Sequence, residues 1–167
     1  MHKLDTLFLD RDGVINVKLD GQYVKNPDDF EFMIGAKAAI SKLSKIFNRI
    51  LIVTNQQGIE KGIMSDNDLC VLHEYMLFEL KKIGGVVDKI YYCPHLAAEN
   101  CNCRKPNSGM IQQAIIDFPT IKIEESYLIG DSDSDIIAGD KMGLNTIKVD
   151  NEYTLSKWYD ELLSVFQ

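Results

Sequence analysis

Two acidic side chains, Asp10 and Asp12, follow directly after the short apolar segment 6–9, and Gly13 comes next. Two carboxylates only two residues apart repel each other unless a cation offsets their charge. The pair therefore indicates a site at which a cation is bound. A solvated turn explains this motif equally well when it is taken alone, because Asp and Gly are both common turn residues.

A second acidic cluster follows a later apolar segment and consists of Asp131, Asp133 and Asp135. Its spacing resembles the start of a calcium-binding EF-hand loop, which needs Gly at its sixth position and Glu at its twelfth. Those positions hold Ile136 and Met142, so this alternative fails. We expect Asp131 to be a metal ligand at a strand end and Asp135 to support it from one helical turn further on. Asp133 is expected to be solvated at the start of a helix, where negative charge is favourable.

Two other polar groups follow apolar segments. Thr54 comes after segment 49–53, where a hydroxyl and free backbone N–H groups can hold phosphate oxygens. A polar cap before the next element is the simpler interpretation of Thr54 alone. Lys105, between Arg104 and Pro106, adds a cation to a chain that otherwise offers acids at these positions, although an Arg-Lys pair is usually surface charge.

Four soft metal ligands fall within eleven positions: Cys93, His95, Cys101 and Cys103. Three thiolates and one imidazole form a closed tetrahedral set that suits Zn²⁺. Because such a set leaves no open coordination position, we expect the zinc to be structural and to hold the loop that leads to residue 105. The alternative is a group of unrelated buried cysteines with a surface histidine.

Cys70 and His73 stand apart from this cluster, on the expected helix 66–83. We interpret them as a thiol in the core and an imidazole on the helix surface, and assign neither a function.

These groups need a scaffold that brings distant segments together, and short apolar segments do alternate with longer amphipathic ones along the chain. The expected strands cover residues 6–9, 49–53, 86–92, 126–129 and 146–149, and the expected helices cover 36–47, 66–83, 108–117, 133–142 and 155–166. Such alternation predicts an α/β fold, a Rossmann-like parallel sheet of about five strands with helices on both faces. Ligands bind beyond the carboxyl ends of such strands, which is where the polar clusters stand. We expect one domain over residues 1–167.

Composition sets outer limits on function. Of 167 residues, 46% are hydrophobic and 26% are charged, which is typical of a globular protein. A net charge of −7 argues against binding nucleic acid over a broad surface. No apolar run approaches the roughly 20 residues that span a bilayer, and no targeting segment is evident. We therefore expect a cytoplasmic monomer that binds neither nucleic acid nor membranes.

Taken in order, the motifs at residues 8–16, 53–55, 105 and 130–135 resemble the haloacid dehalogenase superfamily of phosphotransferases. The resemblance covers almost the whole chain. It implies that Asp10 is a nucleophile that forms an aspartyl-phosphate. It also implies that Asp12 protonates the leaving oxygen and then activates the hydrolytic water.

The same resemblance assigns the metal and the phosphoryl group. Asp10, Asp131 and the backbone carbonyl of Asp12 would hold Mg²⁺. Thr54 and Lys105 would bind the transferring phosphoryl oxygens. Because the segments between these motifs have room for few elements, we expect a member without a cap domain, in which loops select the substrate.

The cysteine loop narrows the resemblance to two related families. Residues 93–95 and 101–106 are similar to the D-glycero-D-manno-heptose-1,7-bisphosphate 7-phosphatases and to the histidinol-phosphate phosphatases. The short spacing between His95 and Cys101 resembles the histidinol enzymes. Residues 16–17, 21–24, 29–32, 54–59 and 104–110 resemble the heptose enzymes, which supply a lipopolysaccharide precursor. We favour the heptose interpretation, with a small phosphorylated sugar as the partner, and keep the histidinol enzymes as the alternative.

On the heptose interpretation, Arg104 would contact the second phosphate or the sugar hydroxyls, because its planar fork suits such groups better than lysine does. The further substrate contacts that we expect are Lys18, Tyr23, Asn55, Gln56 and Gln57.

Two other classes of protein are weighed against this hypothesis. A phosphorelay receiver also has clustered Asp, a Thr and a Lys at strand ends, but it takes its phospho-acceptor from the third strand, which here leads into the cysteine loop. A zinc-organised interaction module would not explain why every catalytic position of the superfamily is filled.

Overall fold

The computed structural model describes residues 3–165, in which five strands form one parallel sheet in the order β3-β2-β1-β4-β5. The strands are β1 (Leu4–Leu9), β2 (Phe47–Asn55), β3 (Lys89–Cys93), β4 (Tyr127–Gly130) and β5 (Asn145–Lys148). The strand β1 lies at the centre. The chain first adds β2 and β3 on one side of it and then crosses back to add β4 and β5 on the other side. The α/β fold expected from the sequence is confirmed.

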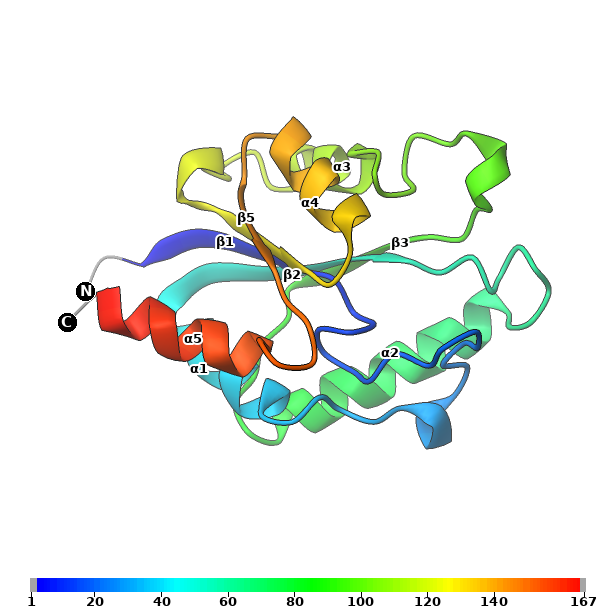
Figure 1. The fold of residues 1–167 in the computed structure, drawn as a ribbon, viewed down its shortest axis with the longest axis horizontal. Coiled ribbons are helices and arrows are strands. Elements are labelled where there is room, and N and C mark those ends of the chain that lie inside the picture. Colours follow the sequence, from blue (N-terminus) through cyan, green and yellow to red (C-terminus); the bar gives the residue numbers. More distant parts are fainter. Residues whose placement is uncertain (1–2, 166–167) are drawn as a thin grey trace.

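Helices cover both faces of the sheet (Figure 1). The helices α1 (Ala36–Ile46), α2 (Asp66–Lys81) and α5 (Leu155–Val165) lie on one face, and α3 (Gly109–Asp117) and α4 (Asp133–Lys141) lie on the other. Alternate residues of β1 serve the two layers: Leu7 and Leu9 pack into the first core, and Phe8 packs into the second. Both faces of the central strands are therefore buried, as is usual for a parallel sheet.

The elements agree with the expected ranges to within two residues, except at β3; Phe47, expected to end a helix, instead begins β2. Residues 86–92 were expected to be a strand, but β3 begins only at Lys89, and Val86 is exposed. The side chain of Asp88 accepts a hydrogen bond from the backbone N–H of Ile50 at 2.8 Å, in the place where a strand would offer a carbonyl. Residue 166, expected to end the last helix, lies outside the described residues.

The helix α2 begins with a capping box. The hydroxyl of Ser65 accepts a hydrogen bond from the backbone N–H of Asp68, and the Asp68 carboxylate accepts one from the N–H of Ser65. Two N–H groups that have no partner inside the helix are satisfied in this way. At the other end, Gly84 adopts a φ of 79°, which allows the chain to reverse after the helix.

Two long connections hold the functional loops. Residues 16–31 include only the short 3-10 helix η1 (Pro27–Asp29), and residues 94–106 include only η2 (Ala97–Glu99). A third 3-10 helix, η3 (Ile123–Glu125), precedes β4. Among residues 3–165 no helix is long and apolar enough to cross a membrane.

We predict that Ser65→Ala lowers the free energy of unfolding by about 1 kcal/mol, because it removes the N-cap of α2. Urea unfolding followed by circular dichroism measures this change. Ser164→Ala is the control, because Ser164 is exposed and its hydroxyl donates only to the Glu161 carbonyl of its own helix. Equal losses in the two variants would contradict the prediction.

Candidate active site

A cavity of about 290 Å³ opens at the carboxyl ends of β1, β2 and β4. Of the predicted catalytic, substrate-binding and Mg²⁺-binding residues, it is lined by Asp10, Asp12, Lys18, Tyr23, Asn55, Gln56, Gln57, Arg104, Lys105 and Asp131. The sequence thus indicated which segments would meet, although they are separated by up to 121 positions from Asp10 to Asp131.

A buried ion-pair cluster of Lys105, Asp10 and Asp135 forms the floor of this cavity. The Nζ of Lys105 lies 2.8 Å from Oδ1 of Asp10 and 2.5 Å from Oδ1 of Asp135, and it donates to the carbonyl of Val53 at 2.7 Å. The side chains of Lys105 and Asp135 are only 3% and 1% exposed. Each charge has lost its water and depends on the others for compensation.

Burial changes the protonation of this cluster. Burial, together with the nearby charge of Asp135, raises the pKa of Asp10 to about 8, although Lys105 acts in the opposite direction. Burial also lowers the pKa of Lys105, but Asp10 and Asp135 outweigh burial and raise it overall. Lys105 is therefore a permanent cation in the site.

Carboxylate oxygens of Asp10, Asp131 and Asp135 lie within 4.8 Å of one another, close enough to share one ion. Hard oxygen donors of this kind suit Mg²⁺. Both oxygens of Asp135 are engaged, Oδ1 with Lys105 and Oδ2 with Ser132, whereas Lys105 meets only Oδ1 of Asp10. Asp10 and Asp131 are therefore the carboxylates that fit the metal best. The loop after β1 passes close to Asp131. A Cβ on residue 13 would lie 2.4 Å from Oδ2 of Asp131, so only glycine fits at this position.

Three donors hold the carboxylate of Asp12. Arg11 and the amide of Asn16 each donate to its Oδ1 at 2.9 Å, and the amide of Gln56 donates to its Oδ2 at 3.0 Å. Although burial acts to raise the pKa of Asp12, these partners outweigh it and hold the pKa below its ordinary value. Asp12 is thus an oriented carboxylate beside Asp10.

The predicted Thr54 is placed differently from its neighbours. Thr54 is fully buried, its hydroxyl accepts a hydrogen bond from Gln56, and it does not line the cavity. Asn55 lines the cavity, but its amide also spans the backbone of Lys105, accepting from the N–H at 3.0 Å and donating to the carbonyl at 3.1 Å. Both Gln56 and Asn55 therefore position other residues of the site.

The rim of the cavity carries the remaining predicted side chains. Lys18 donates to Oδ2 of Asp131 at 3.0 Å, and more than half of its side chain is exposed. The amide of Gln57 donates to the hydroxyl of Tyr23 at 3.0 Å. Arg104 donates to the backbone carbonyl of His95 at 3.3 Å, which joins the rim to the cysteine loop.

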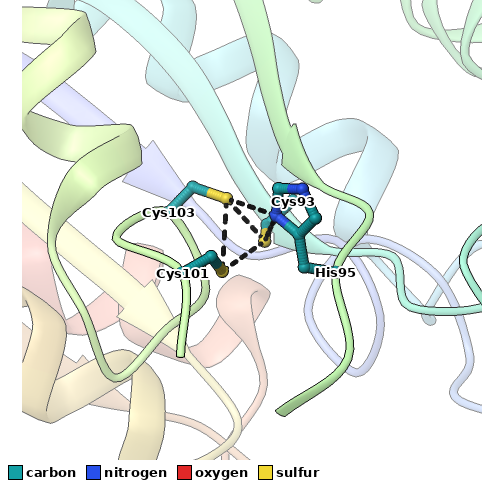
Figure 2. Close-up of side chains that lie close together, drawn as sticks. All are labelled: Cys93, His95, Cys101 and Cys103. Atoms are coloured by element: carbon teal, nitrogen blue, oxygen red, sulfur yellow. Dashed lines mark hydrogen bonds between the residues drawn. The ribbon is translucent and has the colours of Figure 1, made fainter. Parts of the chain in front are cut away.

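Figure 2 shows the cysteine loop, in which Cys93, His95, Cys101 and Cys103 point toward one another. The Sγ of Cys101 lies 3.5 Å from that of Cys93 and 3.6 Å from that of Cys103. Nδ1 of His95 lies 3.5 Å from the sulfur of Cys93 and 3.2 Å from that of Cys103. In a tetrahedral site with Zn–S bonds of about 2.3 Å the sulfurs are about 3.8 Å apart. Two of the three sulfur pairs are near this spacing, while the sulfurs of Cys93 and Cys103 lie only 2.7 Å apart. The donor set itself suits Zn²⁺.

Comparison with known proteins shows which family the chain belongs to. Residues 102–162 match the family model described as HAD-hydrolase-like. The chain is 44% identical over 154 residues to the D-glycero-alpha-D-manno-heptose-1,7-bisphosphate 7-phosphatase of Campylobacter jejuni, covering 90% of this chain and 84% of that protein. It is 41% identical over 147 residues to the D-glycero-beta-D-manno-heptose-1,7-bisphosphate 7-phosphatase of Haemophilus ducreyi, covering 84% and 79%. The solved D,D-heptose 1,7-bisphosphate phosphatase from B. bronchiseptica, complexed with magnesium and phosphate, covers 96% of this chain and 99% of its own, at 30% identity and a TM-score of 0.88.

The chain belongs to the haloacid dehalogenase-like phosphatases. It is a phosphoric monoester hydrolase, so the resemblance noted in the sequence is confirmed at the level of the family.

Two residues of α2 lie on the opposite side of the helix from the one that the sequence predicted. His73 was expected on the helix surface and Cys70 in the core, but His73 is buried and Cys70 is exposed. The buried stripe of α2 consists of Leu69, Leu72, His73, Met76 and Leu80. His73 lies four residues after Leu69 and three before Met76, so helical spacing alone would have placed it inside.

Arg11 and Asn16 were also not assigned a function, although both are buried and both hold Asp12. Their signal in the sequence is weak, because a polar residue in a loop is ordinarily exposed. Asp133 is placed as expected: its side chain is 84% exposed and pairs only with Lys148 on the surface.

We predict that Asp135→Asn abolishes phosphatase activity and lowers the free energy of unfolding by about 3 kcal/mol. The carboxamide oxygen can keep the hydrogen bonds from Ser132, but its NH2 group then faces the ammonium of Lys105. Phosphate release and urea unfolding measure the two effects. In the matched control Asp133→Asn, an exposed ion pair is lost and the expected change in stability is within about 0.5 kcal/mol. Similar losses in both variants would contradict the burial argument.

Proposed function

We propose that this phosphatase removes the 7-phosphate of D-glycero-D-manno-heptose 1,7-bisphosphate. The observation that carries the proposal is the buried carboxylate of Asp10, held against Lys105 on the floor of a cavity beside the oriented carboxylate of Asp12. A nucleophile, a phosphate-binding cation and an acid–base group are thus available in one place. The names of the relatives, which cover most of the chain, support the heptose bisphosphate as substrate.

In this proposal the reaction has two halves. A carboxylate oxygen of Asp10 bonds to phosphorus while the bond from phosphorus to the sugar oxygen breaks. Asp12, which must enter this step protonated although its partners lower its pKa, gives that proton to the sugar oxygen. Water then attacks the aspartyl-phosphate, Asp12 takes up the proton, and orthophosphate leaves with the original Asp10 carboxylate restored. Lys105 and Thr54 are proposed to stabilise the charge of the phosphoryl oxygens, Thr54 after a local movement that brings its buried hydroxyl to the cavity.

The metals are assigned to two sets of residues. We propose that Asp10, Asp131 and the backbone carbonyl of Asp12 hold Mg²⁺, which when bound neutralises charge on the phosphoryl group. The B. bronchiseptica enzyme, which is complexed with magnesium and phosphate, supports Mg²⁺ as the metal. Cys93, His95, Cys101 and Cys103 are proposed to bind a structural Zn²⁺, since the four donors fill a tetrahedral set.

The selection of substrate is assigned to the rim. Arg104 and Lys18 are proposed to bind the second phosphate, because they are the cations of the cavity other than Arg11 and Lys105, which are buried. Tyr23 and Gln57 already share a hydrogen bond and offer polar groups for sugar hydroxyls. We also propose that one phosphatase domain acts in the cytoplasm, which the unpaired cysteines favour. A monomeric state remains a prediction.

We predict that purified protein with Mg²⁺ releases one phosphate from heptose 1,7-bisphosphate and that Asp10→Asn lowers the rate by roughly 10³-fold or more. Both anomers of the sugar are to be compared with histidinol phosphate on one preparation, with phosphate release and the position of the remaining phosphate as readouts. Higher kcat/KM for histidinol phosphate, or release of the 1-phosphate, would contradict the proposed substrate. Unchanged activity in Asp10→Asn would contradict the proposed nucleophile.

We predict that the purified protein contains about one zinc per chain and that Cys101→Ser loses it, because three ligands no longer close the tetrahedron. The backbone N–H of Arg104 lies 3.4 Å from the sulfur of Cys101, so loss of the metal should disturb Arg104 and raise KM more than it lowers kcat. Metal analysis and steady-state kinetics measure the two effects. Cys70→Ser is the control, since Cys70 is exposed on α2 and is not one of the four clustered donors. Full zinc content in Cys101→Ser would contradict the assignment.

A further inference from the structure

A buried guanidinium lies behind the proposed acid–base residue. Arg11 is 1% exposed, and its NH2 group donates to Asp12 at 2.9 Å. Its Nε donates to Oδ1 of Asn16 at 3.2 Å, and its other terminal nitrogen lies 3.1 Å from Nε2 of His73. A guanidinium has donors only, and a buried donor without an acceptor is costly. Each of the three partners therefore helps to fix where the guanidinium sits.

The chemistry of arginine decides the state of His73. Because Arg11 can only donate, Nε2 of His73 must accept, and the ring proton is then on Nδ1. Burial, together with the charge of Arg11, lowers the pKa of His73 to about 3, although Asp12 acts weakly in the opposite direction. His73 is therefore a neutral acceptor that reaches the active site from α2.

A neutral acceptor has a specific advantage at this position. A carboxylate in place of His73 would attract the guanidinium and compete with Asp12 for it. An apolar side chain would leave a buried N–H without a partner and let the guanidinium move. The imidazole satisfies that N–H and leaves Asp12 as the anion that pairs with Arg11.

We propose that His73 is a positioning residue for proton transfer, which fixes Arg11 and, through it, the carboxyl group of Asp12 at the angle from which its acid form protonates the leaving oxygen. The inference rests on the proposed role of Asp12. It adds a residue of α2, outside the cavity and outside the motifs of the sequence, to the machinery of the reaction.

The test uses the leaving group. A sugar alkoxide is a poor leaving group that needs a proton from Asp12, whereas 4-nitrophenolate leaves without one. A misplaced Asp12 should therefore lower kcat/KM for a sugar phosphate much more than for 4-nitrophenyl phosphate. General damage to the fold or to the nucleophile lowers both alike. The ratio of the two kcat/KM values is the readout, and Asp12→Asn gives its limiting value.

We predict that His73→Leu lowers kcat/KM for the sugar phosphate by about tenfold and for the aryl phosphate by less than about twofold. His73→Gln, whose side-chain oxygen can replace Nε2 as acceptor, should restore the ratio to the wild-type value. Met76→Ala is the matched control: it removes a buried side chain three residues further along α2, and it should lower the melting temperature without changing the ratio. Should His73→Leu fail to fold, His73→Glu replaces it, because Glu satisfies the Arg11 N–H and draws the guanidinium away from Asp12. It too should lower the ratio.

An unchanged ratio in His73→Leu, or in His73→Glu where that variant replaces it, would overturn the inference. So would equal losses for both substrates. If wild-type protein hydrolyses another alkyl phosphate in place of the heptose bisphosphate, the proposed substrate fails, and the same ratio measured with that ester still tests His73. If Asp12→Asn itself leaves the ratio unchanged, Asp12 is not the proton donor and the inference fails with it.

Discussion

The contact on which the site depends is the buried ion-pair cluster of Lys105, Asp10 and Asp135. Removing an ammonium and two carboxylates from water is expensive, and the attraction among them repays this cost only where all are held in place. Three separate segments must therefore arrive together: β1 brings Asp10, the start of α4 brings Asp135, and the end of the cysteine loop brings Lys105. The parallel sheet brings the three segments together at the edge where the carboxyl ends of its strands lie. Gly130, at the end of β4, leaves the space that Asp135 occupies, because a Cβ on residue 130 would lie only 2.2 Å from the Cβ of Asp135.

The end of β2 and the cysteine loop both fix the position of Lys105. Asn55 at the end of β2 bonds both the N–H and the carbonyl of Lys105, and the N–H of Arg104 lies against the sulfur of Cys101. Lys105 has to be held in place within a few tenths of an ångström. A long loop without these contacts would be free to move away from the site. The structural metal proposed for the loop would therefore serve the chemistry indirectly, by holding the cation that faces Asp10.

The fold and the strand-end polar clusters could be predicted from the sequence because both follow from local signals, whereas the rim residues Lys18, Tyr23 and Gln57 were predicted only from the family resemblance. Short apolar segments end in polar residues, and a parallel sheet gathers such ends at one edge. The sequence did not predict what the buried polar residues bond to. Gln56 and Asn55 were expected to bind substrate, yet they also hold Asp12 and Lys105, and His73 was placed on the surface although it accepts from Arg11. Hydrogen bonds between residues far apart in the chain, such as the 62 positions from Arg11 to His73, leave no periodic pattern to read.

Two carboxylates only two residues apart can do different work because their partners differ. Asp10 faces inward, where burial and Asp135 raise its pKa, and its charge is offset by Lys105. Asp12 turns to the other side, where Arg11, Asn16 and Gln56 hold its pKa low. The surroundings push the pKa values of these two acids apart, but in the opposite direction to the proposed roles, which need Asp10 ionised and Asp12 protonated. In this phosphatase the separation is produced by burial and Asp135 at Asp10, against the effect of Lys105, and by Arg11 and its neighbours at Asp12. The neutral imidazole of His73 matters for the same reason, because a third charge behind Arg11 would weaken the distinction between the two acids.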